Sequence, residues 1–200
     1  YYLIENLEQI DNWITEAEEL GEVAVDTETN SLDPHQADLV GVSLSSKIGK
    51  ACYIPIGHKS NKCIEKDLVL KKLKPLLEDP SIKKIGQNIK FDFIVFFKHG
   101  INMTSMEDTM LMSYVLDAGK NRHNMDTLSE IHLNHKTISF KDLVGTGKKE
   151  INFSEVDVEK AKDYAAEDAD ITFRLYKKFQ KNLKDEKMIN IYEIDRKSVV

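Results

Sequence analysis

Alternating patterns in the first third of the chain predict three β-strands. Residues 22–28 alternate β-branched with other residues after a break at Gly21. Residues 39–45 and 51–56 have the same strand-like composition, and the short link 46–50 favours a hairpin between them. We therefore expect the sheet to begin with antiparallel strands.

Helical spacing of apolar residues replaces this pattern at Glu65. The predicted helix ends before Pro80 and carries Leu68, Leu70, Leu73, Leu76 and Leu77. A short buried strand at residues 82–85 and a helix over residues 91–97 follow, and that helix is apolar almost all round. Strands and helices thus alternate in this part of the chain.

The second half of the chain is predicted to be mainly helical. One helix opens at Asp108, and Thr127 with Glu130 fits a capping box for the next. Residues 135–153 are the least regular and predict a mobile surface loop, and a long helix covers about residues 158–183. The order of elements predicts the α/β class, a mixed sheet with an antiparallel hairpin at its start and helices on both faces.

Composition and charge narrow the possible functions. The 200 residues, 41% hydrophobic and 31% charged, suit one domain, and no apolar run approaches the roughly 20 residues of a membrane span. The first residues show no export leader, so we expect a cytosolic protein, and Tyr1 in place of methionine indicates a piece of a longer polypeptide. A net charge of −6 argues against bulk electrostatic binding of nucleic acid, but leaves room for a local site bridged by cations.

Two acidic residues are expected on the buried face of a central strand. Asp26 and Glu28 are two positions apart, so both side chains leave the same face of the sheet, together with Ala24. Asp92 lies within the apolar run 91–97. Desolvation and mutual repulsion make such placements unfavourable for stability.

The long helix adds one more inward acid. At about 100° per residue, Asp168 falls near the middle of the apolar stripe, and Tyr164 precedes it by one turn on the same side. By the same count, Asp163, Glu167 and Asp170 are expected to face away from the core. Each inward acid taken alone also fits a helix cap or a salt-bridged core residue.

Together the four inward carboxylates predict a metal site. Two like charges about 4 Å apart repel by about 4 kcal/mol at an effective dielectric constant near 20, and no matching set of inward lysines or arginines is evident. Two divalent ions balance four negative charges, and oxygen ligands favour magnesium or manganese. Such a pair suits phosphodiester hydrolysis. Tyr164, with an ordinary pKa of about 10, is then expected to orient the attacking water and not to act as the base.

Three motifs, in order, resemble those of the DEDD exonucleases of the ribonuclease-H-like superfamily. They are Asp26-Thr-Glu28, Gly86-Gln-Asn-Ile-Lys-Phe-Asp92 and Tyr164-Ala-Ala-Glu-Asp168. The tyrosine-containing branch is favoured because residue 163 is Asp, whereas the histidine branch usually has His at that spacing. Within this branch the chain resembles the proofreading 3′–5′ exonuclease domains of family A bacterial DNA polymerases, the DNA polymerase I type.

The resemblance implies roles for individual residues. Asp26, Glu28, Asp92 and Asp168 would bind two Mg²⁺ or Mn²⁺ ions, and Tyr164 would place the water. Leu32 and Phe140 would wedge and stack against the 3′-terminal bases, although both also suit core positions. The remaining expected contacts with terminal nucleotides or their phosphates are Thr29, Gln87, Asn88, Met110 and Arg122. Gln87 and Asn88 also suit a turn, and Phe91 stands where relatives often have tyrosine.

The resemblance also implies domain limits and a substrate. Residues 1–186 would form the exonuclease domain, and residues 187–200 the truncated start of a polymerase region in the same polypeptide. The substrate would be a single-stranded or frayed DNA 3′ end, the product a nucleoside 5′-monophosphate, and the location the bacterial nucleoid in the cytoplasm. Two alternatives stay open: a ribonuclease D-like exoribonuclease, and a catalytically silent module that supports a polymerase.

Overall fold

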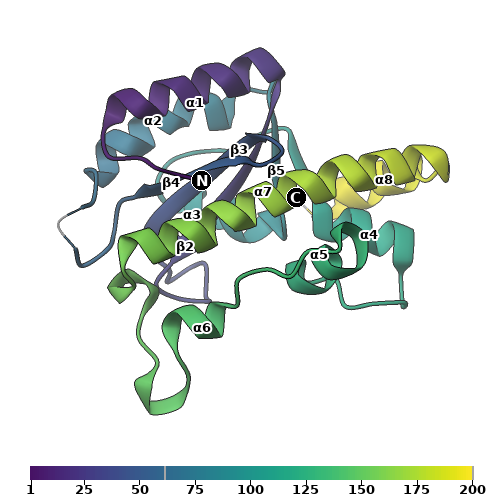
Figure 1. Ribbon diagram of the computed structural model, residues 1–200. Coiled ribbons are helices and arrows are strands. Elements are labelled where there is room, and N and C mark those ends of the chain that lie inside the picture. Colours follow the sequence, from purple (N-terminus) through teal and green to yellow (C-terminus); the bar gives the residue numbers. More distant parts are fainter. Residues whose placement is uncertain (61, 200) are drawn as a thin grey trace.

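A mixed six-stranded sheet forms the centre of the molecule (Figure 1). The structure, a computed structural model, describes residues 1–60 and 62–199, without the side chains of residues 148 and 195–199. The strands lie in the order β1-β4-β3-β2-β5-β6. Their bounds are β1 Tyr2–Leu3, β2 Glu22–Thr29, β3 Leu39–Lys47, β4 Lys50–Pro55, β5 Lys83–Gly86 and β6 Met106–Asp108. β2, β3 and β4 are antiparallel, and β1, β5 and β6 pair parallel with their neighbours, which confirms the predicted antiparallel start.

One face of the sheet is covered by α1 (Leu7–Leu20), α2 (Lys66–Glu78) and α3 (Ile89–Lys98), and α1 and α2 lie side by side. α1 is an element beyond those predicted from the sequence. Asn6 caps this helix by accepting a hydrogen bond from the Gln9 backbone N–H, and Gly21 ends it at φ 69°. Its buried residues, Ile10, Trp13 and Ala17, recur at helical spacing.

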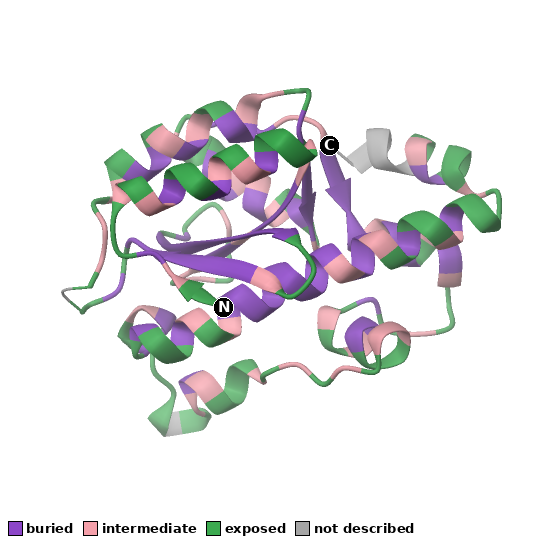
Figure 2. Cartoon of the chain, turned by 45° about the horizontal axis from the view of Figure 1, so that its top comes forward, coloured by how far each residue is buried: buried purple, intermediate pink, exposed green. Residues whose placement is uncertain are grey.

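The opposite face is covered by α7 (Val158–Asp185), which crosses β2, β3, β4 and β5. α4 (Thr109–Asp117), α5 (Met125–Leu133) and α8 (Ile189–Val199) pack beside it. Figure 2 shows the buried sheet between these helical layers. The predicted helices on both faces are confirmed. No helix in the described ranges combines the length and the apolar character that a membrane crossing requires.

Two predictions about local structure are wrong. α5 begins at Met125 after Asn124, because the Leu128 backbone N–H already bonds to the Asn124 carbonyl, so Thr127 lies inside the first turn and does not cap the helix. The stretch 135–153, predicted to be irregular, contains α6 (Phe140–Val144), the 3₁₀ turn η1 (Gly147–Lys149) and the start of the 3₁₀ turn η2 (Phe153–Glu155).

The expected outward direction of Glu167 and Asp170 is also wrong, since both are buried. Asp170 accepts hydrogen bonds from the Gly49 backbone N–H at 2.7 Å and from the Tyr1 hydroxyl at 2.9 Å. Glu167 accepts bonds from the segment before α6. The sheet therefore covers one side of α7, and the N-terminus, the β3–β4 turn and the segment before α6 cover others. Asp163 is exposed, as expected.

Candidate active site

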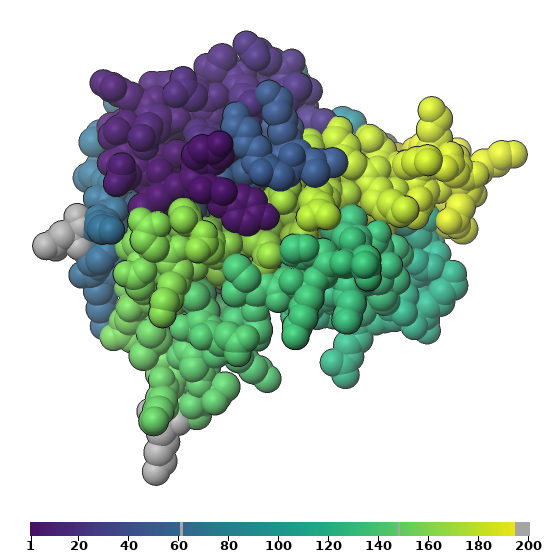
Figure 3. Space-filling model, viewed as in Figure 1, coloured from purple at the N-terminus to yellow at the C-terminus, as the bar shows by residue number. Residues whose placement is uncertain are grey.

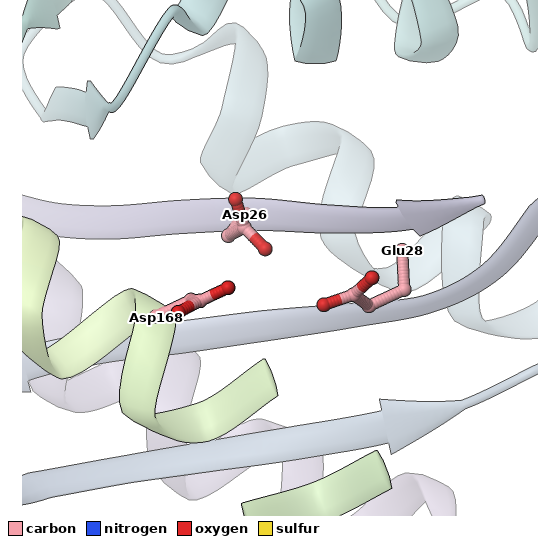
Figure 4. A group of neighbouring side chains, drawn as sticks. All are labelled: Asp26, Glu28 and Asp168. Atoms are coloured by element: carbon pink, nitrogen blue, oxygen red, sulfur yellow. The ribbon is translucent and has the colours of Figure 1, made fainter. Parts of the chain in front are cut away.

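β2 and α7 bring three carboxylates together. Asp26 and Glu28 leave β2 on the side that α7 covers, and Asp168 comes from α7 itself. One carboxylate oxygen from each of the three lies within 4.8 Å of the others. Figure 4 shows the three side chains directed toward one another. Asp26 and Glu28 thus share one face of β2, and Asp168 faces them from α7, as the strand and helix periodicities predict.

Asp92 approaches from α3 at the end of β2. Its Oδ1 accepts hydrogen bonds from the Thr27 backbone N–H at 3.0 Å and from the Thr27 hydroxyl at 2.6 Å. Its carboxylate lies close enough to Asp26 and Glu28 for their charges to interact. The fourth predicted acid therefore borders the same cluster.

The N-terminus of α3 is fixed by Asp108, a residue that sequence reasoning assigned only to the start of α4. Its carboxylate accepts hydrogen bonds from the backbone N–H groups of Asn88 at 3.0 Å and Ile89 at 3.1 Å. It also accepts one from the Met110 N–H at 2.9 Å. Asp108 therefore joins two helix N-termini and positions the turn that carries Asp92.

The electrostatics of the cluster are unfavourable without a cation. Burial raises the pKa of Asp26, of Glu28 and of Asp92, and neighbouring carboxylates raise each further. Burial raises the pKa of Asp168 to about 8, although a hydrogen bond from Tyr164 acts in the opposite direction. Within the described ranges, no lysine, arginine or histidine forms an ion pair with any of the four. A cluster of carboxylate oxygens whose negative charge no cationic side chain balances fits divalent magnesium or manganese.

Tyr164 lies one turn before Asp168 and hydrogen-bonds to it. Burial, followed by the charges of Asp168, Glu28 and Asp26, raises the pKa of its hydroxyl well above the ordinary value. The hydroxyl therefore stays protonated at neutral pH and acts as a hydrogen-bond donor. Its ring packs near Phe140 and Phe153, with centroid distances of 5.8 and 6.1 Å.

A cavity of about 420 Å³ opens beside Glu28 of the carboxylate cluster. Its lining includes Glu28, Thr29 and Leu32 from the end of β2 and the segment after it. Phe140 and Tyr164 also line the cavity. Leu32 is 93% exposed and Phe140 is 41% exposed, so neither is a core residue. Three of the expected substrate contacts, Thr29, Leu32 and Phe140, thus line the same cavity as Glu28 and Tyr164. Phe91 lines it as well.

The other four expected contacts are not part of that cavity's lining. Gln87 accepts a hydrogen bond from the Thr109 hydroxyl and donates one to the His123 carbonyl at 2.7 Å. Asn88 adopts the left-handed conformation at φ 61°, which suits the turn that sequence analysis also considered. Met110 lies in the first turn of α4, and Arg122 in the segment between α4 and α5.

A buried tyrosine beside the acids was missed by sequence reasoning. Tyr53 on β4 is fully buried, interacts electrostatically with Glu28 and Asp26, and shares a 2.7 Å hydrogen bond with His58. Gly41, which pairs with Glu28 across β2 and β3, makes room for it, because a Cβ there would lie 2.1 Å from the Tyr53 hydroxyl oxygen. A glycine inside a strand was the available signal.

Comparison with known proteins agrees with this geometry. A family model described as 3′-5′ exonuclease matches residues 1–184. The chain belongs to this 3′-5′ exonuclease family. It is 42% identical over 215 aligned residues to DNA polymerase I of Rhizobium leguminosarum, covering 96% of this chain and 21% of that protein. It is 44% identical over 172 residues to DNA polymerase I of Pseudomonas aeruginosa, covering 83% and 19%. The exonuclease domain thus spans about a fifth of the length of these relatives.

Solved structures show the same fold as the exonuclease domain. Brucella melitensis NrnC bound to pGG superposes with a TM-score of 0.75 at 24% identity, covering 99% of this chain and 88% of that one. Escherichia coli RNase D, an exoribonuclease, gives 0.71 at 16% identity, covering 100% and 49%. The predicted ribonuclease-H-like fold and the resemblance to the exonuclease domains of DNA polymerase I are therefore confirmed.

Proposed function

We propose that this exonuclease domain hydrolyses DNA from the 3′ end, releases nucleoside 5′-monophosphates, and proofreads for a family A polymerase in the same polypeptide. The observation that carries the proposal is the cluster of Asp26, Glu28 and Asp168, whose member Glu28 also lines a cavity. That cavity has exposed apolar and aromatic walls at Leu32 and Phe140, which suit a base more than a phosphate.

The carboxylates of Asp26, Glu28, Asp92 and Asp168 are the residues that would hold two divalent cations, Mg²⁺ or Mn²⁺. When bound, such ions lower the pKa of a water molecule and neutralise charge that develops on the phosphate and the leaving oxygen. Other side chains of the protein would orient these groups. Thr27 fixes the Asp92 carboxylate, and Tyr164 donates a hydrogen bond from a hydroxyl that keeps its proton.

The residues that line the cavity support the proposed selection of a frayed end. Leu32 and Phe140 can separate and stack against terminal bases only when these bases are unpaired. Thr29 lies beside them and would contact the terminal nucleotide. Gln87, Asn88, Met110 and Arg122, away from the cavity lining, would contact neighbouring nucleotides or phosphates.

The partner and location proposed here rest on the relatives. These are DNA polymerases I about five times as long as the matched segment. We propose that residues 187–200 begin the region that leads to a polymerase domain, and that the protein acts at the bacterial nucleoid in the cytoplasm.

An exoribonuclease of the ribonuclease D type is the second candidate. The observation in its favour is the superposition on Escherichia coli RNase D over the whole chain, at low identity. A catalytically silent support module is a third. It is disfavoured because all four acids and Tyr164 are present, because Asp26, Glu28 and Asp168 form one cluster, and because Asp92 and Tyr164 interact electrostatically with members of that cluster.

One experiment separates the three candidates. The chain is incubated with 5′-labelled single-stranded DNA or RNA of the same sequence, with Mg²⁺, Mn²⁺ or chelator. The proposal expects a descending ladder on DNA that disappears with chelator and with Asp26→Ala. Faster digestion of RNA would favour the ribonuclease, and a folded chain that leaves both strands intact with either metal would favour the silent module.

A further inference from the structure

Glu167 precedes Asp168 and is buried although sequence periodicity placed it outside the core. It is not part of the carboxylate cluster. Its Oε2 accepts a hydrogen bond from the Ile138 backbone N–H at 2.6 Å, and its Oε1 pairs with His135 Nε2 at 2.8 Å. Because a carboxylate only accepts hydrogen bonds, the His135 Nε2 carries the proton in this contact.

Both partners of Glu167 lie on one segment, residues 134–139, which we call the α5–α6 connector. Figure 1 shows this connector running along α7 from α5 to α6. Residue 139 is the N-cap of α6, and Phe140 is its first helical residue. The Ile138 N–H held by Glu167 is thus two residues from the aromatic ring that lines the cavity.

The two ends of α6 are held in different ways. At its C-terminal end, Val144 is buried in an apolar cluster with Ala161 and Ala165 of α7. At its N-terminal end, Phe140 is 41% exposed and lies against Phe153 and Tyr164. Figure 3 shows that the part of the chain around α6 projects from the body of the molecule. Buried apolar packing therefore fixes the C-terminal end, whereas the half-exposed N-terminal end is held by its ring contacts and by the connector that leads into it.

The connector is also tied to α5, through the Ser129 hydroxyl, which donates to the His135 carbonyl at 2.9 Å, and through Thr137, which donates to Asp126 at 2.7 Å. These bonds set the connector relative to α5. The bonds of Glu167 set it relative to α7, the helix that carries Tyr164 and Asp168.

We infer that Glu167 is a positioning residue for the proposed nuclease reaction: it fixes the Phe140 wall of the cavity at the correct distance from the carboxylate cluster, to which α7 contributes Asp168, so that the 3′-terminal base stacks in register with the scissile phosphate. The inference rests on the proposed function and deepens it. It assigns to Glu167 a role in substrate binding through Phe140, and none in the chemical step.

The chain supplies a closely matched control in Asp170. It lies on the same helix, is buried, and also accepts one backbone and one side-chain hydrogen bond, from Gly49 and Tyr1. Those partners belong to the β3–β4 turn and the N-terminus, and neither leads to Phe140. A merely structural effect of removing a buried acid from α7 is therefore expected from both residues.

The test measures binding and kinetics in parallel. Binding is followed in chelator by the fluorescence of 2-aminopurine at the 3′ end of a single-stranded oligonucleotide, because base stacking quenches this fluorophore. Kinetics are followed on the same oligonucleotide with Mg²⁺. The variants are Glu167→Ala, Asp170→Ala and Phe140→Ala, with the double variants Glu167→Ala/Phe140→Ala and Asp170→Ala/Phe140→Ala.

Glu167→Ala is expected to raise Kd and KM about 5-fold or more, to weaken the quenching, and to leave kcat within about 2-fold. In the Phe140→Ala background the same substitution should change Kd and KM less than about 1.5-fold, since the wall it positions is gone. Asp170→Ala should leave Kd, KM and quenching near the wild-type values in both backgrounds.

The inference is overturned by an equal rise in Kd and KM with or without Phe140, by a loss confined to kcat, or by the same effect from Asp170→Ala. If Glu167→Ala does not fold, His135→Ala removes one of the two bonds from a less buried position and is expected to give a smaller rise that also vanishes without Phe140. A wild-type chain that binds and quenches the probe but cuts nothing contradicts the proposed function and leaves the binding comparison decisive for Glu167.

Discussion

Thr27 holds the carboxylate of Asp92 with two hydrogen bonds, one from its backbone N–H at 3.0 Å and one from its hydroxyl at 2.6 Å. Thr27 lies between Asp26 and Glu28 on β2, and its side chain leaves the opposite face of the strand. A single strand thus supplies two of the acids and orients a third, which belongs to α3.

Thr27→Val removes one of these bonds and keeps the shape of the side chain. Because Asp92 then loses the shorter of its two hydrogen bonds from Thr27, we expect the Mg²⁺ concentration for half-maximal cleavage to rise about 10- to 100-fold. Activity should largely recover at saturating metal. Thr27→Ser keeps the hydroxyl and should remain within a few-fold of the wild type, and an unchanged metal requirement in Thr27→Val would contradict this role.

Gly41→Ala tests the buried tyrosine beside the acids. The added Cβ would meet the Tyr53 ring, which is fully buried and cannot move aside freely, so we expect a loss of roughly 1–3 kcal/mol in the free energy of unfolding. Cleavage should also weaken, because Tyr53 interacts electrostatically with Glu28 and Asp26. Urea unfolding and the oligonucleotide ladder measure the two effects.

Ser43→Ala on the same strand is the control for Gly41→Ala. The Ser43 hydroxyl is buried with no hydrogen-bond partner among the described residues, so its removal should leave stability unchanged or increase it slightly. Equal destabilisation by both substitutions would show that β3 tolerates no change of any kind, and the specific role of Gly41 would be lost.

The stability of the metal-free chain should depend on pH in a defined direction. The pKa of Asp168 is raised from an unfolded value of about 3.9 to about 8 in the folded chain. Its contribution to stability is therefore fully present below about pH 4 and is lost as the pH rises through about 8, because the unfolded chain then binds fewer protons than the folded one.

Thermal or urea unfolding in chelator between pH 4 and pH 9 measures this dependence. The difference between wild type and Asp168→Asn isolates the contribution of Asp168 from those of other titrating groups. We expect the wild type to lose stability relative to the variant across this window, and saturating Mg²⁺ to restore it at high pH. A constant difference across the window would contradict the raised pKa.

Local periodicity was sufficient for the parts of the site that lie on regular elements. Asp26 and Glu28 share a face because strand side chains alternate, and Asp168 lies beside the sheet because it falls on the apolar stripe of α7. Asp92 is detectable as a charge within an apolar run. The resemblance in the three motifs then supplied the family.

Contacts between distant segments were not predictable in this way. A helical wheel assigns one buried side to α7, but the α5–α6 connector and the β3–β4 turn cover Glu167 and Asp170 from other directions. The bond between Asp108 and the start of α3 depends on the parallel pairing of β5 with β6. These relationships arise from tertiary packing, which the spacing of residues along the chain does not encode.

The central claim is that the acidic cluster is a binding site for divalent cations. Calorimetric titration of the chain with Mn²⁺, in the presence of a nucleoside 5′-monophosphate, tests it most directly. We expect two ions per chain, with protons released at neutral pH because the carboxylates with raised pKa values must ionise to bind metal, and we expect Asp26→Ala to abolish tight binding. A folded wild-type chain that takes up no Mn²⁺ under these conditions would contradict the account.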